Sequence, residues 1–146
     1  MAQPSDNFAN ILLAEDNPAD QRLIAEALKR HHLNPRLQVV ENGEAALSAA
    51  KEAGHDDKPC PDVFILDLHM PRVDGLDVLR EFRANEHCQH TPVIVFTSSV
   101  SPVIRTSVES FNGVRIISKP TDLDEFLAFG AVVKSVLMPG QAAASY

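Results

Sequence analysis

The sequence predicts an α/β fold in which a doubly wound sheet of five parallel strands is covered by five helices. Short apolar runs alternate five times with longer amphipathic stretches along the chain. The apolar runs are almost continuously aliphatic or β-branched, which is typical of strands buried on both faces of a parallel sheet. The length of 146 residues, with 45% hydrophobic and 23% charged residues, is that of one globular domain.

Each strand is predicted from a run of aliphatic residues bounded by turn or loop residues. The second run, residues 36–40, alternates between apolar and polar side chains, whereas the third run, residues 63–66, is apolar throughout. The third run is therefore expected to be the most buried strand. In chain order, the five strands are expected at residues 10–15, 36–40, 63–66, 92–97 and 114–118.

The helices are predicted from capping residues and from apolar residues at helical spacing. Asn17 and Pro18 suit the N-cap and the first position of the first helix. The dipeptide Asn42-Gly43 is a turn signal before the second helix, and a loop rich in glycine, aspartate and proline follows at residues 54–61. In chain order, the helices are expected at residues 18–32, 44–53, 75–84, 101–111 and 121–138.

Charge and composition exclude several classes of function. The net charge of −7 argues against binding to nucleic acid or to an anionic membrane, because little positive charge is available to neutralise phosphates. No run of 18 apolar residues could span a bilayer, and residues 1–10 lack the features of a signal peptide. Cys60 and Cys88 are far apart and form no CxxC motif, so inert, unpaired thiols in a reducing cytoplasm are expected.

Polar side chains follow four of the predicted strands. Glu15 and Asp16 follow the first strand, Asp67 the third, Thr97 ends the fourth, and Lys119 follows the fifth. The carboxyl ends of parallel strands share one edge of the sheet, where such folds bind ligands. Three carboxylates in one crevice repel each other unless a cation joins them, and Mg2+ suits such oxygen ligands. A lysine and a hydroxyl beside them suit the oxygens of a transferred phosphoryl group.

Five stretches with these residues occur in a fixed order and carry a family resemblance. They lie at residues 14–20 (Ala-Glu-Asp-Asn-Pro-Ala-Asp), 64–71, 74–76, 93–98 and 119–120. Over residues 10–138 the sequence resembles the receiver domain of two-component response regulators, which implies a flavodoxin-like fold with strand order 2-1-3-4-5. The opening motif and the long loop at 54–61 are similar to those of stand-alone regulators that partner bacterial phytochrome kinases.

The resemblance implies a role for each residue at the strand ends. Asp67 would accept a phosphoryl group from a sensor histidine kinase, and Thr97 and Lys119 would contact that group. A cis bond between Lys119 and Pro120 is also implied, and His69, two residues after Asp67, is expected to tune dephosphorylation. The groups expected to hold Mg2+ are Glu15, Asp16, Asp67 and the backbone carbonyl of His69.

Two positions depart from the family pattern. Ile116 stands three residues before the lysine, where the family usually has an aromatic ring that swings inward on phosphorylation. Ser98 follows Thr97, where alanine or glycine is common. The expected chemistry is unchanged by either residue, but the coupling of the hydroxyl to a ring cannot operate in the usual way.

The predicted function is that of a single-domain response regulator that catalyses only its own phosphorylation and dephosphorylation. Residues 1–9 and 139–146 are expected to be tails, with no output domain, so signalling would use protein contact or a phosphorelay. The alternatives are a phosphorylation-independent binding module and a phosphate sink. An aspartate-nucleophile phosphatase is disfavoured because His69 stands where such enzymes place a second acid. A zinc site at residues 87–90 is disfavoured for lack of a second ligand pair.

The last predicted helix has a wide apolar arc. No charged residue occurs between Glu125 and Lys134, and Phe129 is expected at the exposed shoulder of the arc. Exposed apolar patches often mark partner sites. A homodimer is therefore expected through this helix, the fourth helix and the fifth strand, unless the C-terminal tail covers the arc.

Overall fold

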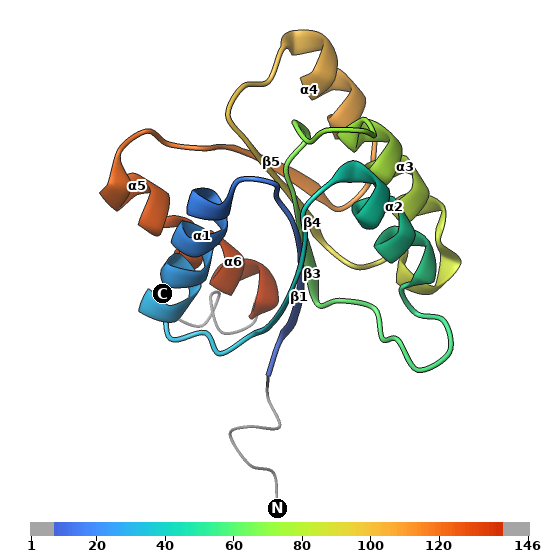
Figure 1. The fold of residues 1–146 in the computed structure, drawn as a ribbon, viewed down its shortest axis with the longest axis horizontal. Helices are drawn as coiled ribbons and strands as arrows, with labels where there is room; N and C mark the ends of the chain where they lie inside the picture. Colours follow the sequence, from blue (N-terminus) through green and yellow to red (C-terminus); the bar gives the residue numbers. More distant parts are fainter. Residues whose placement is uncertain (1–7, 139–146) are drawn as a thin grey trace, which may run out of the picture.

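The computed structural model describes residues 8–138, so the expected tails lie largely outside the described part of the chain. Within it, five parallel strands form one sheet in the order β2-β1-β3-β4-β5, as expected (Figure 1). The register pairs Leu13 of β1 with Val39 of β2 and with Ile65 of β3. The strands are β1 (Asn10–Ala14), β2 (Arg36–Val40), β3 (Val63–Leu66), β4 (Val93–Thr97) and β5 (Val114–Ser118).

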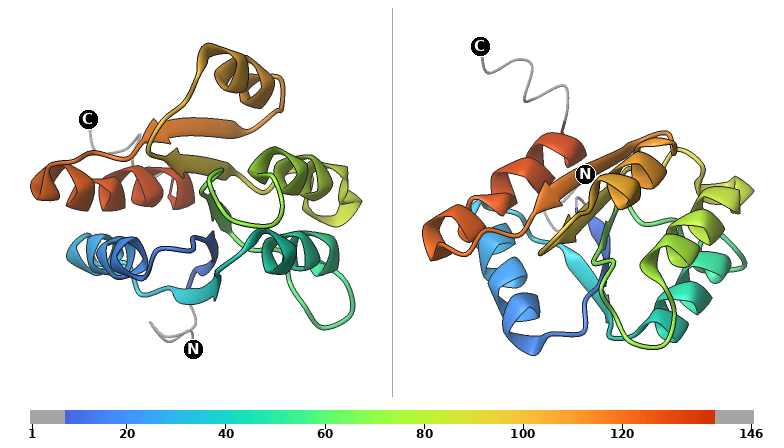
Figure 2. Two further views of the ribbon diagram at one scale, coloured as in Figure 1. Left: turned by 45° about the horizontal axis from the view of Figure 1, so that its top comes forward. Right: turned by 90° about the horizontal axis from the view of Figure 1, so that it is seen from above.

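Helices cover both faces of this sheet (Figures 1 and 2). One face carries α1 (Pro18–Arg30), α5 (Leu123–Leu127) and α6 (Phe129–Leu137), with α1 packed against the other two. The opposite face carries α2 (Gly43–Glu52), α3 (Gly75–Ala84) and α4 (Pro102–Glu109), and a short 3-10 helix, η2 (Glu86–Cys88), follows α3. Within residues 8–138, no helix is long and apolar enough to cross a membrane.

Side-chain caps fix where the helices begin. The Asn17 side chain accepts hydrogen bonds from the backbone of Ala19 and Asp20, which confirms the predicted start of α1. Asn42 and Asp74 cap α2 and α3 in the same way. These caps satisfy backbone N–H groups that have no partner within the helix. Each therefore sets the position of a helix relative to the strand before it.

Two apolar cores lie on the two faces of the sheet. Every residue of β3 and of β4 is buried, which confirms that the central strands are covered on both sides. On the α2–α3 face, the rings of Phe64 and Phe82 meet edge to face, with centroids 5.0 Å apart. On the α1–α6 face, Phe96 stacks on Phe129 with centroids 3.9 Å apart.

The C-terminal helix differs from the prediction in two ways. It is divided at Ala128, where the Ala131 amide bonds to the Ala128 carbonyl, so α5 and α6 together replace one helix over residues 121–138. Phe129 is only 3% exposed, so its expected place in a dimer contact is wrong. The reason is that α6 lies close on α1, since a Cβ at Gly130 would be 2.2 Å from the Ala27 carbonyl oxygen. This approach turns Phe129 into the core.

Two local expectations about covalent geometry are also wrong. Cys60 and Cys88 form a disulfide, with Cα atoms 5.6 Å apart, because the 54–61 loop lies against η2. The two cysteines are 28 residues apart, so the proximity arises from the fold. Residues 8–138 contain no cis peptide, so the Lys119–Pro120 bond is trans, the isomer that X-Pro bonds favour intrinsically.

Replacement of Phe129 by alanine tests the buried stacking arrangement. We expect Phe129→Ala to lower the free energy of unfolding by about 3–5 kcal/mol, because it leaves a cavity beside Phe96. Leu123→Ala is the matched control, since Leu123 is 56% exposed on α5 and should change stability by less than about 0.5 kcal/mol. Urea denaturation followed by far-ultraviolet circular dichroism measures both. If Phe129→Ala changed the free energy of unfolding as little as Leu123→Ala, the buried position of Phe129 would be contradicted.

Candidate functional site

Asp67 lies directly after β3 with its carboxylate held at both oxygens. Its Oδ1 accepts hydrogen bonds from the Thr97 hydroxyl (2.9 Å) and from the His69 amide (3.0 Å). Its Oδ2 accepts from Lys119 Nζ at 2.9 Å. The backbone amide of Asp67 extends the sheet by donating to the Ala14 carbonyl at 3.0 Å. The sheet and the surrounding side chains therefore fix the direction of this carboxylate. Asp67 is also buried, with only 5% of the residue exposed.

The Lys119 ammonium lies at the centre of the site. Its Nζ donates to Glu15 Oε1 (2.6 Å), Asp20 Oδ2 (2.8 Å) and Asp67 Oδ2 (2.9 Å), so all three donors are used. Burial lowers the pKa of Lys119, but the hydrogen bonds to the three carboxylates outweigh it and raise the pKa above its usual value. Its backbone amide donates to the Thr97 carbonyl at 2.8 Å, which joins the end of β5 to that of β4. Lys119 is therefore charged at neutral pH, and its hydrogen bonds hold it in one position.

Glu15 is the most buried carboxylate of the group. Burial raises its pKa to about 7, although hydrogen bonds from Lys119 and from the Asn17 amide lower it. Gln21 donates to the Glu15 carbonyl at 2.8 Å and holds the backbone at this point. A neighbouring positive charge would favour the ionised form of Glu15. The side chain is therefore poised to lose a proton when a cation arrives.

The acidic cluster has the donor set of a divalent-cation site. Glu15, Asp16 and Asp67 each offer a carboxylate oxygen, and these atoms lie within 4.8 Å of one another. Oxygen ligands with access to water suit Mg2+ and Mn2+, and Asp16 is exposed while the other two are buried. The three carboxylates predicted from the strand ends thus come together, and Thr97 and Lys119 lie beside them.

The fold also gives a place to residues whose roles the sequence did not indicate. Asp20, part of the opening motif, reaches Lys119 from the first turn of α1, and its place among the acidic residues of that motif was the only sequence signal for this contact. The His69 ring lies 3.0 Å from the Ser99 carbonyl, across the mouth of the site. This contact between the loops after β3 and β4 has no sequence signal.

The two departures from the family pattern lie next to the site. Ile116 is half-buried on β5, opposite Val95 of β4, and packs against the core on the α2–α3 face. Ser98 is exposed directly after Thr97. An aliphatic side chain on β5 therefore stands where the family usually has an aromatic ring.

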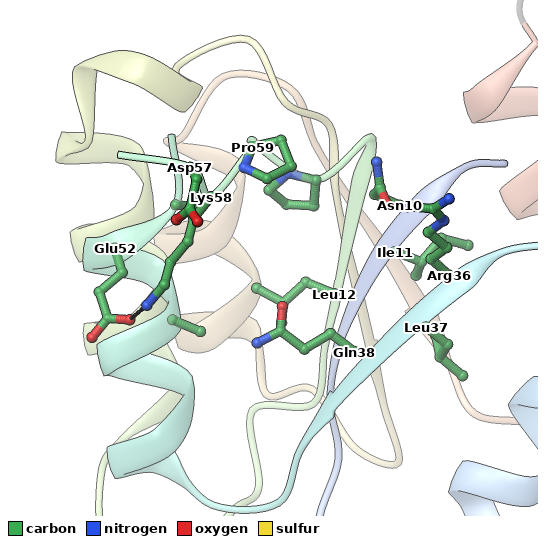
Figure 3. A pocket seen from close by; sticks show the side chains of 13 residues that line it. Asn10, Ile11, Leu12, Arg36, Leu37, Gln38, Glu52, Asp57, Lys58 and Pro59 are labelled. Atoms are coloured by element: carbon green, nitrogen blue, oxygen red, sulfur yellow. Dashed lines mark hydrogen bonds and ion pairs between the residues drawn. The ribbon is translucent and has the colours of Figure 1, made fainter. Parts of the chain in front are cut away.

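A surface hollow lies away from the acidic cluster of Glu15, Asp16 and Asp67. It has a volume of about 690 Å³ and is lined by residues at the amino ends of β1 and β2 and by the loop after α2 (Figure 3). Asn10 and Arg36 begin these strands, and Lys58 and Pro59 form the opposite wall. The hollow contains none of the residues that surround Asp67, so it is separate from the candidate site.

Comparison with known proteins gives the family. A model of the response regulator receiver domain matches residues 11–129. The response regulator Rcp1 of Synechocystis sp. is 38% identical over 90 residues, which are 61% of this chain and 61% of Rcp1. The match therefore spans less than two thirds of the length of this curated relative.

Three solved structures show how closely the fold is shared. The Mn(2+)-bound form of Rcp1 has a TM-score of 0.77 at 29% identity, covering 87% of this chain and 92% of Rcp1. The phosphorylated cyanobacterial phytochrome response regulator RcpA has a TM-score of 0.80 at 26% identity, and the match covers 90% of this chain and 94% of RcpA. The receiver domain of the sensor histidine kinase PA1611 of Pseudomonas aeruginosa, with magnesium in its active-site cleft, has a TM-score of 0.66 at 25% identity, covering 90% and 96%.

Sequence, fold and site agree with one another. The family model spans nearly the whole sheet, and receivers of the same fold hold divalent cations. The acidic cluster of this chain has the oxygen ligands that such cations require. The chain therefore belongs to the response regulator receiver domain family.

Proposed function

We propose that this protein is a phosphorylation switch in which Asp67 accepts a phosphoryl group from a phosphohistidine of a sensor histidine kinase. The observation that carries the proposal is the Asp67 carboxylate, oriented by Thr97 and Lys119 beside an acidic cluster. A carboxylate oxygen attacks phosphorus, the histidine N–P bond breaks, and an aspartyl phosphate forms. The protein thus catalyses only its own phosphorylation and dephosphorylation.

The residues around Asp67 divide the work of stabilising the transferred group. Mg2+ supplies positive charge that offsets the phosphoryl oxygens, and Glu15, Asp16, Asp67 and the His69 carbonyl are the groups that we propose hold it. Lys119 turns its ammonium from Asp67 to a phosphoryl oxygen while Glu15 and Asp20 keep it in place. The Thr97 hydroxyl, now bonded to Asp67, donates to another phosphoryl oxygen. In both cases, a hydrogen bond to Asp67 is replaced by a hydrogen bond to the phosphoryl group.

His69 is in a position to govern how long the phosphoryl group remains. Its amide donates to Asp67, and its ring contacts Ser99 in the loop after β4. We propose that this ring controls the approach of the water that hydrolyses the aspartyl phosphate. The half-buried Ile116 would then make signalling rely on the loops after β3 and β4, since no ring follows Thr97 inward.

The kinase is proposed to be of the bacteriophytochrome type, acting in the cytoplasm. The support is the likeness to the stand-alone regulators Rcp1 and RcpA, which cover the whole sheet of this chain. We propose that the domain spans residues 10–138 and signals by protein contact or as a step in a phosphorelay, without binding nucleic acid. The alternatives, a phosphate sink and a phosphorylation-independent binding module, lack a specific observation in their favour.

Labelling with a small phosphodonor tests the assignment of Asp67. With acetyl phosphate and Mg2+, we expect one phosphoryl group per chain that hydroxylamine removes, as it does from an acyl phosphate, and Asp67→Asn should abolish labelling because the amide is not a nucleophile. The matched control is Asp57→Asn, an exposed loop residue that should label like the wild type. Intact-mass spectrometry measures the gain. Labelling of Asp67→Asn at the wild-type level would show that another residue accepts the group.

Mg2+ affinity should depend on pH through Glu15. Because the pKa of Glu15 is about 7 without a metal, the cation must displace a proton at pH 6 but not at pH 8. We expect binding to be weaker by about tenfold at pH 6, measured by isothermal titration calorimetry. Asp16→Asn should weaken binding at both pH values, and Glu15→Gln should remove the pH dependence. An affinity that is equal at both pH values in the wild type would contradict the role of Glu15.

We also propose a homodimer through the α4-β5-α5 face. Phe129 is buried and is no longer part of the proposed contact. Val103 of α4 is 75% exposed and Leu123 of α5 is 56% exposed, on the two sides of the edge strand β5. We expect beryllofluoride, a phosphoryl mimic, to favour the dimer, and Val103→Asp to shift it to monomer because charges would enter the contact. Analytical ultracentrifugation at tens of micromolar, with Val39→Asp on the opposite edge as control, decides this. A wild type that stays at 16.0 kDa throughout would refute the dimer.

A further inference from the structure

Four side chains of metal-ligating types are neighbours in the described part of the chain, far from Asp67 and near the amino ends of the strands, although no three of their ligand atoms lie within 4.8 Å of one another as those of Glu15, Asp16 and Asp67 do. Cys60 and Cys88 form the disulfide between the 54–61 loop and η2. Beside them the rings of His55 and His87 meet edge to face, with centroids 4.4 Å apart. The four residues come from two segments of the chain, the 54–61 loop and η2. Their proximity is therefore a product of the fold.

Gly54 creates the space in which these side chains meet. Its φ of +82° is in the left-handed region that favours glycine. A Cβ at Gly54 would lie 2.5 Å from His87 Cβ, 3.0 Å from Cys60 Sγ and 3.3 Å from Cys88 Sγ. One point beside the backbone thus touches three of the four residues, and His55 is the next residue in the chain. The cluster surrounds Gly54 closely.

Backbone hydrogen bonds hold the two histidines at fixed positions. The turn at residues 54–58 is closed by bonds from the Gly54 amide to the Lys58 carbonyl (2.7 Å) and from the Lys58 amide to the His55 carbonyl (2.9 Å). The His87 amide donates to the side chain of the buried Asn85 at 3.0 Å. Asn85 in turn donates to the Ala50 and Ala53 carbonyls at the end of α2. Asn85 therefore ties η2 to the end of α2.

The surroundings of the imidazoles suit a cation. Both rings line a hollow of about 260 Å³ on the protein surface. The charged side chains that share this hollow are Glu81, Glu86 and Lys51, so two carboxylates face one ammonium. The hollow gives an ion a path from solvent to the two rings.

We propose that His55, Cys60, His87 and Cys88 form a zinc site when the disulfide is reduced. Two thiolates and two imidazoles are the ligand set of structural, tetrahedral zinc. Thiolates bound at about 2.3 Å in that geometry lie about 3.8 Å apart, which cysteines with Cα atoms 5.6 Å apart can span by side-chain rotation. The ligand spacing in the sequence matches no zinc-finger motif, so only the fold indicates the site.

The chemistry connects two crosslinked states. A dithiol reductant passes two electrons and two protons to the disulfide, so its own thiols become a disulfide and Cys60 and Cys88 become thiols. Zinc binding then releases both thiol protons to water as the thiolates coordinate the ion. In the oxidised protein the disulfide joins the 54–61 loop to η2, and in the reduced protein zinc takes over that link. This site does not depend on the proposed role of Asp67.

Cobalt serves as the probe for this site. The full chain is reduced with a phosphine, freed of oxygen and titrated with Co2+ in excess Mg2+, which occupies the acidic cluster. We expect one Co2+ per chain, with thiolate-to-cobalt charge-transfer absorption in the near ultraviolet, tetrahedral bands in the visible, and displacement by Zn2+. The oxidised chain should show none of these signals. Absence of the charge-transfer band in the reduced wild type would overturn the proposal.

Variants of the histidines separate this site from simple thiol binding. His55→Asn and His87→Asn keep both cysteines, and each should weaken Co2+ binding at least tenfold, since even outer partners of metal ligands cost about 10–100-fold. His90→Asn, an exposed histidine outside the cluster, is the control and should bind as the wild type does. Circular dichroism checks that each variant is folded. Unchanged affinity in both His55→Asn and His87→Asn would also overturn the proposed ligand set.

Discussion

The contact of the Lys119 ammonium with three carboxylates is the interaction on which the site depends. Glu15, Asp20 and Asp67 come from three parts of the chain, and each lies within 2.9 Å of the same nitrogen. Without this cation the buried carboxylates would repel each other, and at least one would retain its proton. The raised pKa of Glu15 shows that one ammonium does not fully compensate the burial of these groups. A divalent cation beside these carboxylates would favour the ionised form of Glu15.

Sheet topology explains why these groups can meet. The order β2-β1-β3-β4-β5 puts the ends of β1 and β3 side by side, so Glu15 and Asp67 are neighbours across one strand pair. Lys119 reaches them from the edge strand, held by the bond of its amide to Thr97. The helices that connect the strands lie on the two faces of the sheet (Figure 2). The strands thus place Glu15 and Asp67 within hydrogen-bond distance of the Lys119 ammonium.

Local patterns were sufficient for most of this architecture. β2, β3, α3 and β5 begin and end where their patterns place them, because apolar runs and capping residues act over a few positions. The strand ends also revealed Glu15, Asp16, Asp67, Thr97 and Lys119. What could not be predicted depends on contacts between distant segments. The burial of Phe129 follows from the approach of α6 to α1, and the Cys60–Cys88 pair from the packing of a loop on η2.

The two ends of the sheet have opposite mechanical requirements. At the carboxyl ends, the proposed phosphoryl transfer requires Lys119 and Thr97 to replace their hydrogen bonds to Asp67 with bonds to the phosphoryl group, beside the exposed Ser98 and Ser99 of the loop after β4. At the amino ends, Asn85 and the Cys60–Cys88 link tie α2, η2 and the 54–61 loop into one unit. A rigid end confines the response to the other end, because packed elements move as units. Under the proposed function, Ile116 cannot act as a swinging ring, and the loops around Asp67 would carry the change outward.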